Sequence, residues 1–149
     1  MGIADDALEV RTQGWRTLAA LHDFIEGRLE RSLGKHVNLS VVEYTVLDAL
    51  SRQDGRHLRM QQLARASALS PSATTRLVNR LEERGLLARV LCAEDRRGIY
   101  TELTAAGHDL LDRARPFHDT ALGRALAEAH EVPELAGLVS ALPQLALAH

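Results

Sequence analysis

The segment from Leu69 to Cys92 constrains the fold of this chain more than any other. Ser70 is a residue type that caps helix N-termini, and Pro71 follows at the first helical position, where its missing N–H costs no hydrogen bond. Gly85 ends the helical pattern, as glycine commonly does. The segment therefore predicts one helix whose two ends are both encoded locally.

The predicted helix has two faces of different chemistry. The inward side carries small and apolar residues: Ala73, Thr74, Leu77 and Leu81. The opposite side is short, polar and partly basic: Ser72, Thr75, Arg76 and Asn79. Glu82 and Glu83 follow and would repel phosphate, so only the N-terminal half of the helix suits a nucleic acid.

Arginine and asparagine can form paired hydrogen bonds with guanine and adenine edges in the major groove. A helix that enters the groove by its N-terminal end has the docking geometry of a helix-turn-helix recognition helix. On this segment alone, an ordinary amphipathic surface helix is an equally good interpretation.

The residues that follow favour the DNA-binding interpretation. Leu86–Leu91 has the pattern of a short strand, residues 93–98 form a charged turn, and Ile99–Leu103 alternates as a return strand. His57–Arg59 can add a third strand. A helix followed by a two-stranded wing is the winged helix-turn-helix arrangement, with residues 60–66 as the short helix before the turn.

At this point the chain resembles the multiple antibiotic resistance regulator (MarR) family of winged helix-turn-helix transcriptional regulators. The resemblance spans about residues 39–107 and rests on the segments LSVVEYTVLDAL, LRMQQLA, SPSATTRLVNRLEERGLL and Asp95-Arg96-Arg97-Gly98 running into LTAAG. It implies a sequence-specific DNA-binding regulator, not an enzyme, that binds an inverted-repeat operator as a homodimer. It further implies a repressor released by a small molecule.

Residues of the helix and of the wing are the candidates for contact with double-stranded DNA. They are Ser70, Ser72, Thr74, Thr75, Arg76, Asn79, Arg80, Asp95, Arg96 and Arg97. In the family, an Asp-x-Arg motif directs its arginine toward the minor groove, and the matching residues here are Asp95 and Arg97. Arg96 is expected to meet phosphate or solvent.

The expected fold is mainly α with a small β-hairpin wing, in a single domain of residues 1–149. A winged helix-turn-helix lobe (39–103) is flanked by helices at residues 1–38 and 104–149. Both flanks carry apolar residues at helical spacing with few DNA-suited side chains, which indicates dimerisation helices. Closure of these helices over the monomer's own core is the alternative.

Local signals also predict where these other helices begin and end. The first helix should run from about Glu9 to Leu33 and break at Gly34. Ser40 and Glu43 form a capping box for the second helix. Thr104 should cap a helix that runs to about His130 and bends at Pro116, because proline removes a backbone hydrogen bond. Pro133 opens the last helix.

The positive charge is concentrated in the winged segment. The chain of 149 residues has a net charge of −2, but residues 52–97 contain ten arginines and five acidic residues. The flanks are acidic, with five Lys/Arg against eight Asp/Glu in residues 1–51 and three against seven in residues 98–149. This distribution fits a nucleic-acid partner for the central segment.

Other chemistries find little support. The seven histidines are scattered without zinc-site spacing, so neither a metal nor another cofactor is expected, although a metal-responsive regulator with ligands assembled by folding stays an alternative. The single cysteine, Cys92, is expected to be a half-buried thiol, with a redox role as the alternative. Catalytic motifs are missing. A winged-helix protein-interaction module is a further alternative.

The chain has no apolar run long enough for a membrane and no signal-peptide pattern, so a soluble, cytoplasmic protein is expected. The resemblance also implies an effector cleft for phenolic or other anionic aromatic molecules. Candidate lining residues are Trp15, His22, Tyr44 and Arg59. For Trp15 and Tyr44, packing in the core is the alternative role.

Overall fold

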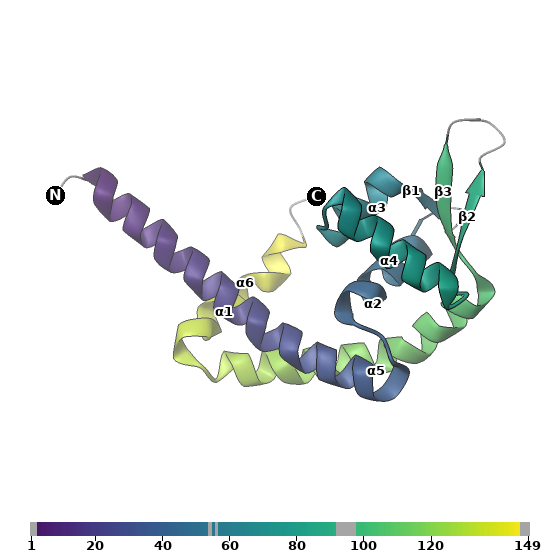
Figure 1. The fold of residues 1–149 in the computed structure, drawn as a ribbon. Helices are drawn as coiled ribbons and strands as arrows, with labels where there is room; N and C mark the ends of the chain where they lie inside the picture. The colour runs from purple at the N-terminus through teal and green to yellow at the C-terminus, as the bar shows by residue number, and fades with distance from the viewer. Residues whose placement is uncertain (1–2, 54, 56, 92–97, 147–149) are drawn as a thin grey trace. The chain divides into compact units, whose positions relative to one another are not determined.

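The structure, a computed structural model, describes residues 3–53, 55, 57–91 and 98–146. Its elements follow the order α1 (Ile3–Val37), α2 (Val41–Ser51), β1 (His57–Arg59), α3 (Met60–Ser67), α4 (Pro71–Glu83), β2 (Leu87–Leu91), β3 (Ile99–Leu103), α5 (Ala105–His130) and α6 (Pro133–Leu145). Figure 1 shows these helices and the small sheet. The predicted fold class, mainly α with a β-hairpin wing, is confirmed.

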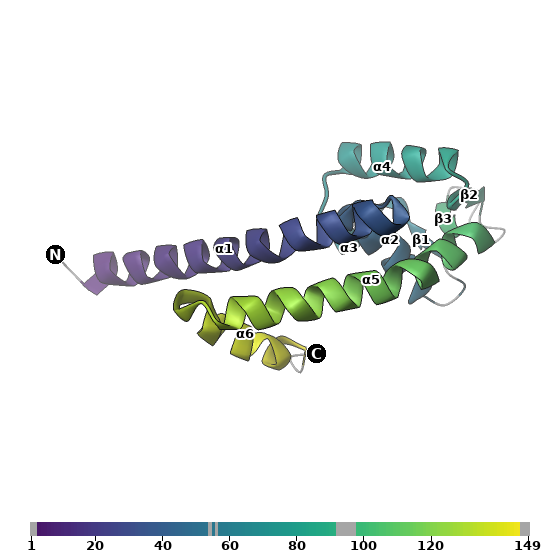
Figure 2. The same ribbon diagram turned by 90° about the horizontal axis from the view of Figure 1, so that it is seen from below.

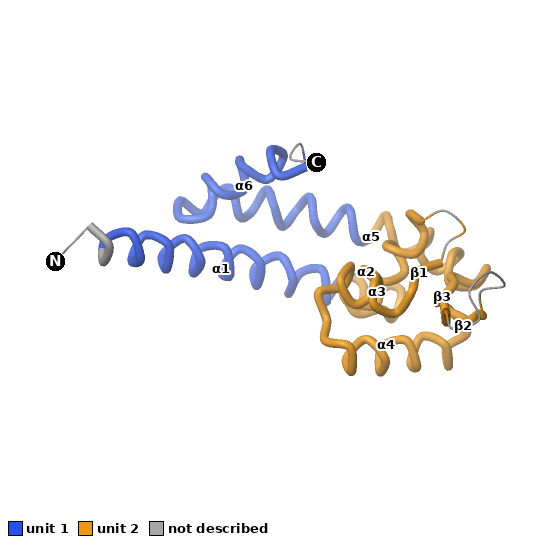
Figure 3. The backbone as a smooth tube through the Cα atoms, turned by 90° about the horizontal axis from the view of Figure 1, so that it is seen from above, with its two compact units in different colours: residues 1–32, 118–149 blue, residues 33–117 orange. Residues whose placement is uncertain are grey.

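The chain forms two compact units, coloured separately in Figure 3. One unit contains residues 1–32 and 118–149, and the other contains residues 33–117. Both divisions fall inside helices, so α1 and α5 each contribute to both units. Residues 39–103, the predicted winged lobe, all belong to the second unit.

The sheet of the second unit is antiparallel, and its strand order is β1-β3-β2. His57–Arg59 therefore does supply the predicted third strand. Leu87 pairs with Leu103, and both are buried in the core. Leu91 pairs with Ile99, and both are exposed to solvent. The hairpin is anchored at its base by these buried leucines.

Helix α2 supplies much of the core of the second unit. Its capping box is present, because the Ser40 Oγ accepts from the Glu43 N–H at 3.1 Å and the Glu43 carboxylate accepts from the Ser40 N–H at 2.9 Å. Val46, Leu47 and Leu50 are fully buried. The predicted start of this helix is confirmed.

The sequence predicted that helix α1 breaks at Gly34, but the structure shows no break there. It continues to Val37, and the chain turns at Asn38, whose φ is 53°. Leu33 and Val37 are buried one helical turn apart. Their burial outweighs the cost of a helical glycine, about 1 kcal/mol. Asparagine tolerates the left-handed conformation that ends the helix.

Helix α5 begins as predicted, with the Gly107 N–H donating to the Thr104 Oγ1 at 3.0 Å. The same hydroxyl donates to the Gly85 carbonyl at 2.7 Å, which ties the start of α5 to the end of α4. A Cβ atom on Gly107 would collide with the backbone oxygen of Leu86. The helix continues through Pro116.

In the first unit, α6 folds back along α5 (Figure 2). Leu21, Ala129 and Leu135 are buried together, and partly buried residues surround them: Phe24, Ile25, Val132, Leu138 and Val139. An ion pair between Arg28 and Glu128, at 2.8 Å, joins α1 to α5. Large apolar side chains nevertheless stay exposed: Leu8, Val10, Trp15, Leu18 and Leu145.

Two further observations concern the described residues only. None of their helices is both long and apolar enough to cross a bilayer. Their histidine, cysteine and acidic side chains form no group of three or more that could hold a metal ion.

Candidate nucleic-acid interface

Helix α4 has the caps that its sequence predicted. The Ala73 N–H donates to the Ser70 Oγ at 3.2 Å, and Pro71 occupies the first turn. At the other end Arg84 is the C-cap, and Gly85 follows it with φ +74°, in the left-handed region. Both ends of α4 are therefore stabilised by the residues next to them.

One face of α4 is packed against the core of its unit. Leu77, Val78 and Leu81 are buried, as is Leu63 of α3. The turn between α3 and α4 passes through Ala68, whose φ is 56°. This is the geometry of a helix-turn-helix, with α3 as the first helix and α4 as the second.

The opposite side of α4, called here the outer face, consists of exposed residues: Ser72, Thr75, Arg76, Asn79 and Arg80. Thr74 does not belong to it. Its side chain is only 1% exposed, and its hydroxyl donates to the Ser70 carbonyl at 2.9 Å. Thr74 is therefore a buried packing residue, and its prediction as a DNA contact is corrected. Ser70 is exposed, but its hydroxyl serves the cap.

The arginines around α4 fall into two groups. Arg84 pairs with Glu43 at 3.3 Å, and Arg89 pairs with Glu82 at 2.8 Å. Within the part of the chain that the structure describes, Arg76 and Arg80 have no carboxylate within ion-pair distance. These two cations on the outer face can therefore interact with phosphates or base edges without first losing an internal partner.

Arg89 of β2 joins the wing to α4, a role that the sequence analysis missed. Its Nη2 donates to the Asn79 Oδ1 at 2.6 Å, and its Nη1 donates to the Glu82 Oε1 at 2.8 Å. The Arg89 backbone N–H also donates to the Glu82 Oε2, at 3.2 Å. Asn79 and Glu82 lie one helical turn apart, so a single guanidinium reaches both.

The tip of the wing lies outside the described residues. The residues outside the description include Asp95, Arg96 and Arg97, which were predicted to contact DNA. They also include Cys92, the candidate redox residue. The described strands end beside that tip with Leu91 and Ile99, which are paired and exposed.

The candidate effector residues belong to different units. Trp15 and His22 lie on α1 in the first unit, where Trp15 is 66% exposed and His22 lies 3.5 Å from Asp23 and Glu26. In the second unit Tyr44 is only 6% exposed, which favours a packing role.

Arg59, on β1 of the second unit, donates from Nε to the Tyr100 hydroxyl at 3.1 Å. Its guanidinium lies 5.3 Å from the centre of the Tyr100 ring. The outer side of the sheet thus carries a cation beside an aromatic ring.

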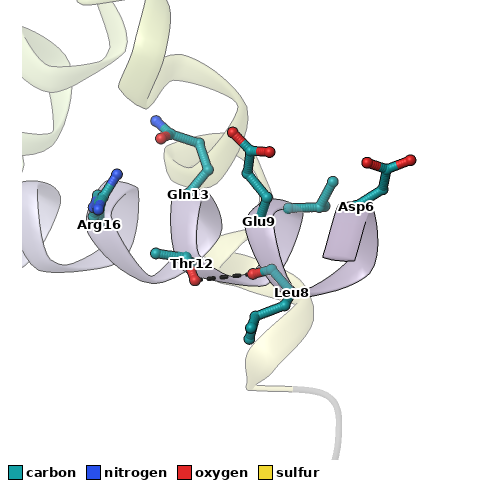
Figure 4. Close-up of a pocket in the computed structure, with 7 residues that line it drawn as sticks. Asp6, Leu8, Glu9, Thr12, Gln13 and Arg16 are labelled. Carbon is teal, nitrogen blue, oxygen red and sulfur yellow. Dashed lines mark hydrogen bonds between the residues drawn. The ribbon is translucent and has the colours of Figure 1, made fainter. Parts of the chain in front are cut away.

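A hollow lies along the N-terminal part of α1, shown in Figure 4. Its lining residues all come from this one helix: Asp6, Leu8, Glu9, Val10, Thr12, Gln13 and Arg16. The Thr12 hydroxyl is turned back onto the Leu8 carbonyl at 2.9 Å. A hollow lined by one helix encloses little, so it is an open surface with a mixed apolar and charged character.

Together, the capped α4 helix, its turn from α3 and the hairpin that follows define a winged helix-turn-helix protein. The MarR family model matches residues 37–98. An HTH-type transcriptional repressor of Mycobacterium tuberculosis is 31% identical over 127 residues, which cover 85% of this chain and 86% of the relative. A second relative, an HTH-type transcriptional regulator of Bacillus subtilis, is 28% identical over 93 residues, which cover 62% of this chain and 59% of that relative.

Solved structures show the same similarity. Sco3205, a MarR family transcriptional regulator from Streptomyces coelicolor solved in complex with DNA, is 26% identical with a TM-score of 0.74, over 99% of this chain and 88% of that one. CouR from Rhodococcus jostii, solved bound to p-coumaroyl-CoA, is 33% identical with a TM-score of 0.65, over 72% and 73%. This chain belongs to the MarR family of transcriptional regulators. It is a DNA-binding regulator and not an enzyme.

Proposed function

We propose that this protein is a homodimeric repressor that binds an inverted-repeat operator through the outer face of α4 and is released by a small molecule. The observation that carries the proposal is the outer face itself. Arg76 and Arg80 are exposed there without a carboxylate partner among the described residues, and Asn79 lies beside them. Donors of this kind read guanine and adenine edges, and the cations add phosphate affinity.

Further contacts are proposed around this face. Ser72 and Thr75 are exposed on it and suit phosphate or base contacts, and Ser70 adds its place at the helix N-terminus. At the tip of the wing, Arg97 enters the minor groove, Asp95 orients it, and Arg96 meets phosphate. A narrow A·T-rich minor groove favours a guanidinium because its negative potential is enhanced.

Dimerisation is proposed to use residues 1–38 and 104–149. Leu8, Trp15 and Leu18 on α1, with Leu145 on α6, leave apolar surface exposed on the first unit. Exposed apolar surface of this kind is typical of protein–protein interfaces. A two-fold dimer would also supply the second α4 helix that an inverted repeat requires.

The proposed effector is an anionic aromatic molecule. CouR, solved bound to p-coumaroyl-CoA, supports this class of ligand. Trp15, His22 and Arg59 are the residues proposed to contact it, because they offer an aromatic surface and cationic or hydrogen-bonding groups. Tyr44, which is buried, would act by packing. As a DNA regulator, the protein is proposed to work in the cytoplasm.

The proposal is tested by selecting bound sequences from a random duplex pool and then titrating the selected duplex and a random duplex by fluorescence anisotropy at several salt concentrations. We expect an inverted repeat, a steep salt dependence on both duplexes and tighter binding to the selected one. Binding without sequence preference would overturn operator reading. Adding p-coumaroyl-CoA or simpler phenolic acids should release the operator, and unchanged binding with all of them would overturn the effector class.

A further inference from the structure

We propose that Arg89 is a positioning residue for base reading, because it fixes which end of the Asn79 amide faces the DNA. The inference rests on the proposed reading of DNA by the outer face of α4. It assigns a function to a residue of β2 that lies outside that face.

The contact has a defined hydrogen-bond polarity. A guanidinium only donates, whereas an amide has an oxygen that accepts and a nitrogen that donates. The 2.6 Å contact between the Arg89 Nη2 and the Asn79 Oδ1 therefore requires the amide oxygen to face β2. Turning the amide over would place two donors against each other.

Arg89 is itself held in place. Glu82 accepts from the Arg89 Nη1 at 2.8 Å and from the Arg89 backbone N–H at 3.2 Å. The Arg89 side chain is 30% exposed, so it is partly sheltered from water. The contacts to Glu82 and Asn79 are charge-assisted, which restricts rotation of the guanidinium. Glu82, which was expected from the sequence to repel phosphate, has its charge paired with Arg89.

This arrangement leaves the Asn79 amide nitrogen as the end that points away from Arg89. Among the described residues, that nitrogen has no hydrogen-bond acceptor. A donor directed at the major groove is satisfied by purine N7, guanine O6 or thymine O4, but not by cytosine, which presents its N4 amino donor. Arg89 would thus make Asn79 reject cytosine at the base that it faces.

Without Arg89 the amide could adopt either orientation, because its oxygen would lose the donor that holds it. One orientation presents the nitrogen and the other presents the oxygen, which accepts from cytosine N4. Removal of Arg89 should therefore relax selectivity at one base pair. Selectivity at base pairs read by Arg76 should stay unchanged, because the side chain of Arg89 contacts Asn79 and Glu82 instead.

The experiment uses the full chain and the sequence selected by the wild-type protein. Asn79→Ala first identifies the base pair at which discrimination depends on Asn79. Affinities for all four base pairs at that position are then measured for wild type, Arg89→Ala, Arg89→Lys, Asn79→Ala and the Asn79→Ala/Arg89→Ala double variant. Arg52→Ala, which removes an exposed arginine at the end of α2, outside the proposed DNA-binding and dimerisation residues, is the charge-matched control.

Arg89→Ala should reduce discrimination against cytosine about 10-fold at that position and at no other. In the Asn79→Ala background it should change discrimination no further, because the two residues act as a unit. Arg89→Lys keeps the charge but lacks the planar fork, so it should show the same relaxation with an unchanged salt slope. Arg52→Ala should keep the wild-type pattern.

Four results would overturn the inference. Equal weakening on every sequence, with a salt slope lowered by about one, would mean that Arg89 contacts phosphate. A lower melting temperature with full discrimination in both Arg89 variants would mean that the contact is only structural. Discrimination that survives Asn79→Ala at every position would remove base reading by Asn79, and this inference with it. If Asn79→Ala does relax one position and the Arg89 variants do not, only the role of Arg89 fails.

Discussion

At the scale of single residues, charge pairing separates the arginines near α4 by function. Arg84 and Arg89 hold the unit together through Glu43 and Glu82. Arg76 and Arg80 have no such partner among the described residues, so each can release counterions when it meets DNA. The salt dependence of binding should therefore follow the unpaired arginines more closely than the total number of positive charges.

The first prediction concerns Arg76. Arg76→Ala should weaken binding to the selected sequence by about 1–3 kcal/mol and relax preference at one base pair, because it removes a donor pair from the outer face. Arg52→Ala removes the same charge from an exposed position at the end of α2 and should leave binding almost unchanged. Anisotropy titrations on selected and random duplexes measure both effects. Equal losses on the two duplexes would show that Arg76 contacts only phosphate.

The second prediction separates two residues of the wing tip. Arg97→Ala should weaken binding and lower the slope of log affinity against log salt by about one unit, because one cation is lost. Asp95→Ala should weaken binding without lowering that slope, because it removes only the group that orients Arg97. A wild-type affinity and slope for Arg97→Ala would show that α4 binds DNA without help from the wing.

Residue chemistry that acts over one helical turn could be predicted from the sequence. The caps at Ser70 and Ser40 and the exposed face of Arg76 and Asn79 all follow from local spacing. The Arg89–Asn79 contact could not be predicted, because it joins strand β2 to helix α4 across the turn at Gly85. Hydrophobic periodicity within a segment does not show which residue a long side chain contacts in another segment. Thr74 was included among the DNA contacts although the helical wheel placed it on the inward side. It is buried there and turns its hydroxyl to the backbone.

At the scale of elements, the start of α5 is packed against the end of the turn that follows α4. Gly107 makes this possible, since the Leu86 carbonyl occupies the space where a Cβ would lie. Thr104 reinforces the junction by donating to the Gly85 carbonyl while it caps α5. The position of β2 relative to α5 therefore depends on a residue without a side chain.

The third prediction tests this junction. Gly107→Ala should lower the free energy of unfolding by about 1–3 kcal/mol, because the added methyl group forces α5 away from Leu86. Gly123→Ala, in the same helix with open space at its Cβ, should raise it by about 0.4–1 kcal/mol through reduced unfolded-state entropy. Urea denaturation measures both. Two stabilising substitutions would show that the junction has room to relax.

The boundaries of helices matched the sequence-based prediction where capping residues or proline set them. They differed from the prediction where burial of side chains set them. Thr104 and Pro133 mark helix starts that could be predicted. The end of α1 could not, because the burial of Leu33 and Val37 outweighs the helix-breaking tendency of Gly34. Tertiary packing of that kind has no signature in a single segment.

At the scale of the whole molecule, the exposed apolar residues of the first unit make its assembly testable. The fourth prediction is that Leu8→Glu/Leu18→Glu shifts the protein from dimer to monomer, because charge is introduced into apolar surface. Gln61→Glu adds a charge to an exposed position on α3 and should leave the dimer intact. Sedimentation equilibrium gives the mass of each variant. A wild-type protein that is already monomeric would contradict dimerisation.

The fifth prediction concerns the spacing of the operator. A two-fold dimer should bind half-sites about 10 base pairs apart, centre to centre, which is one turn of the duplex. Inserting five base pairs between the half-sites would move one of them to the opposite face of the DNA, so affinity should fall toward that for random sequence. Inserting ten base pairs should return both half-sites to the same face of the DNA but leave them too far apart. Unimpaired binding after the five-base-pair insertion would rule out rigid two-site recognition.

The division of the chain inside α1 and α5 bears on which sequence changes the protein can accept. Both connections between the units are continuous helices, in which each residue adds about 100° of rotation and 1.5 Å of length. A single-residue insertion or deletion near residue 32 or 118 would change the helical phase of everything beyond it, whereas a substitution there would not. Insertions and deletions of single residues should therefore be tolerated poorly at these two places. Chimaeras that exchange one unit with that of a relative should function only when both helices are joined in register.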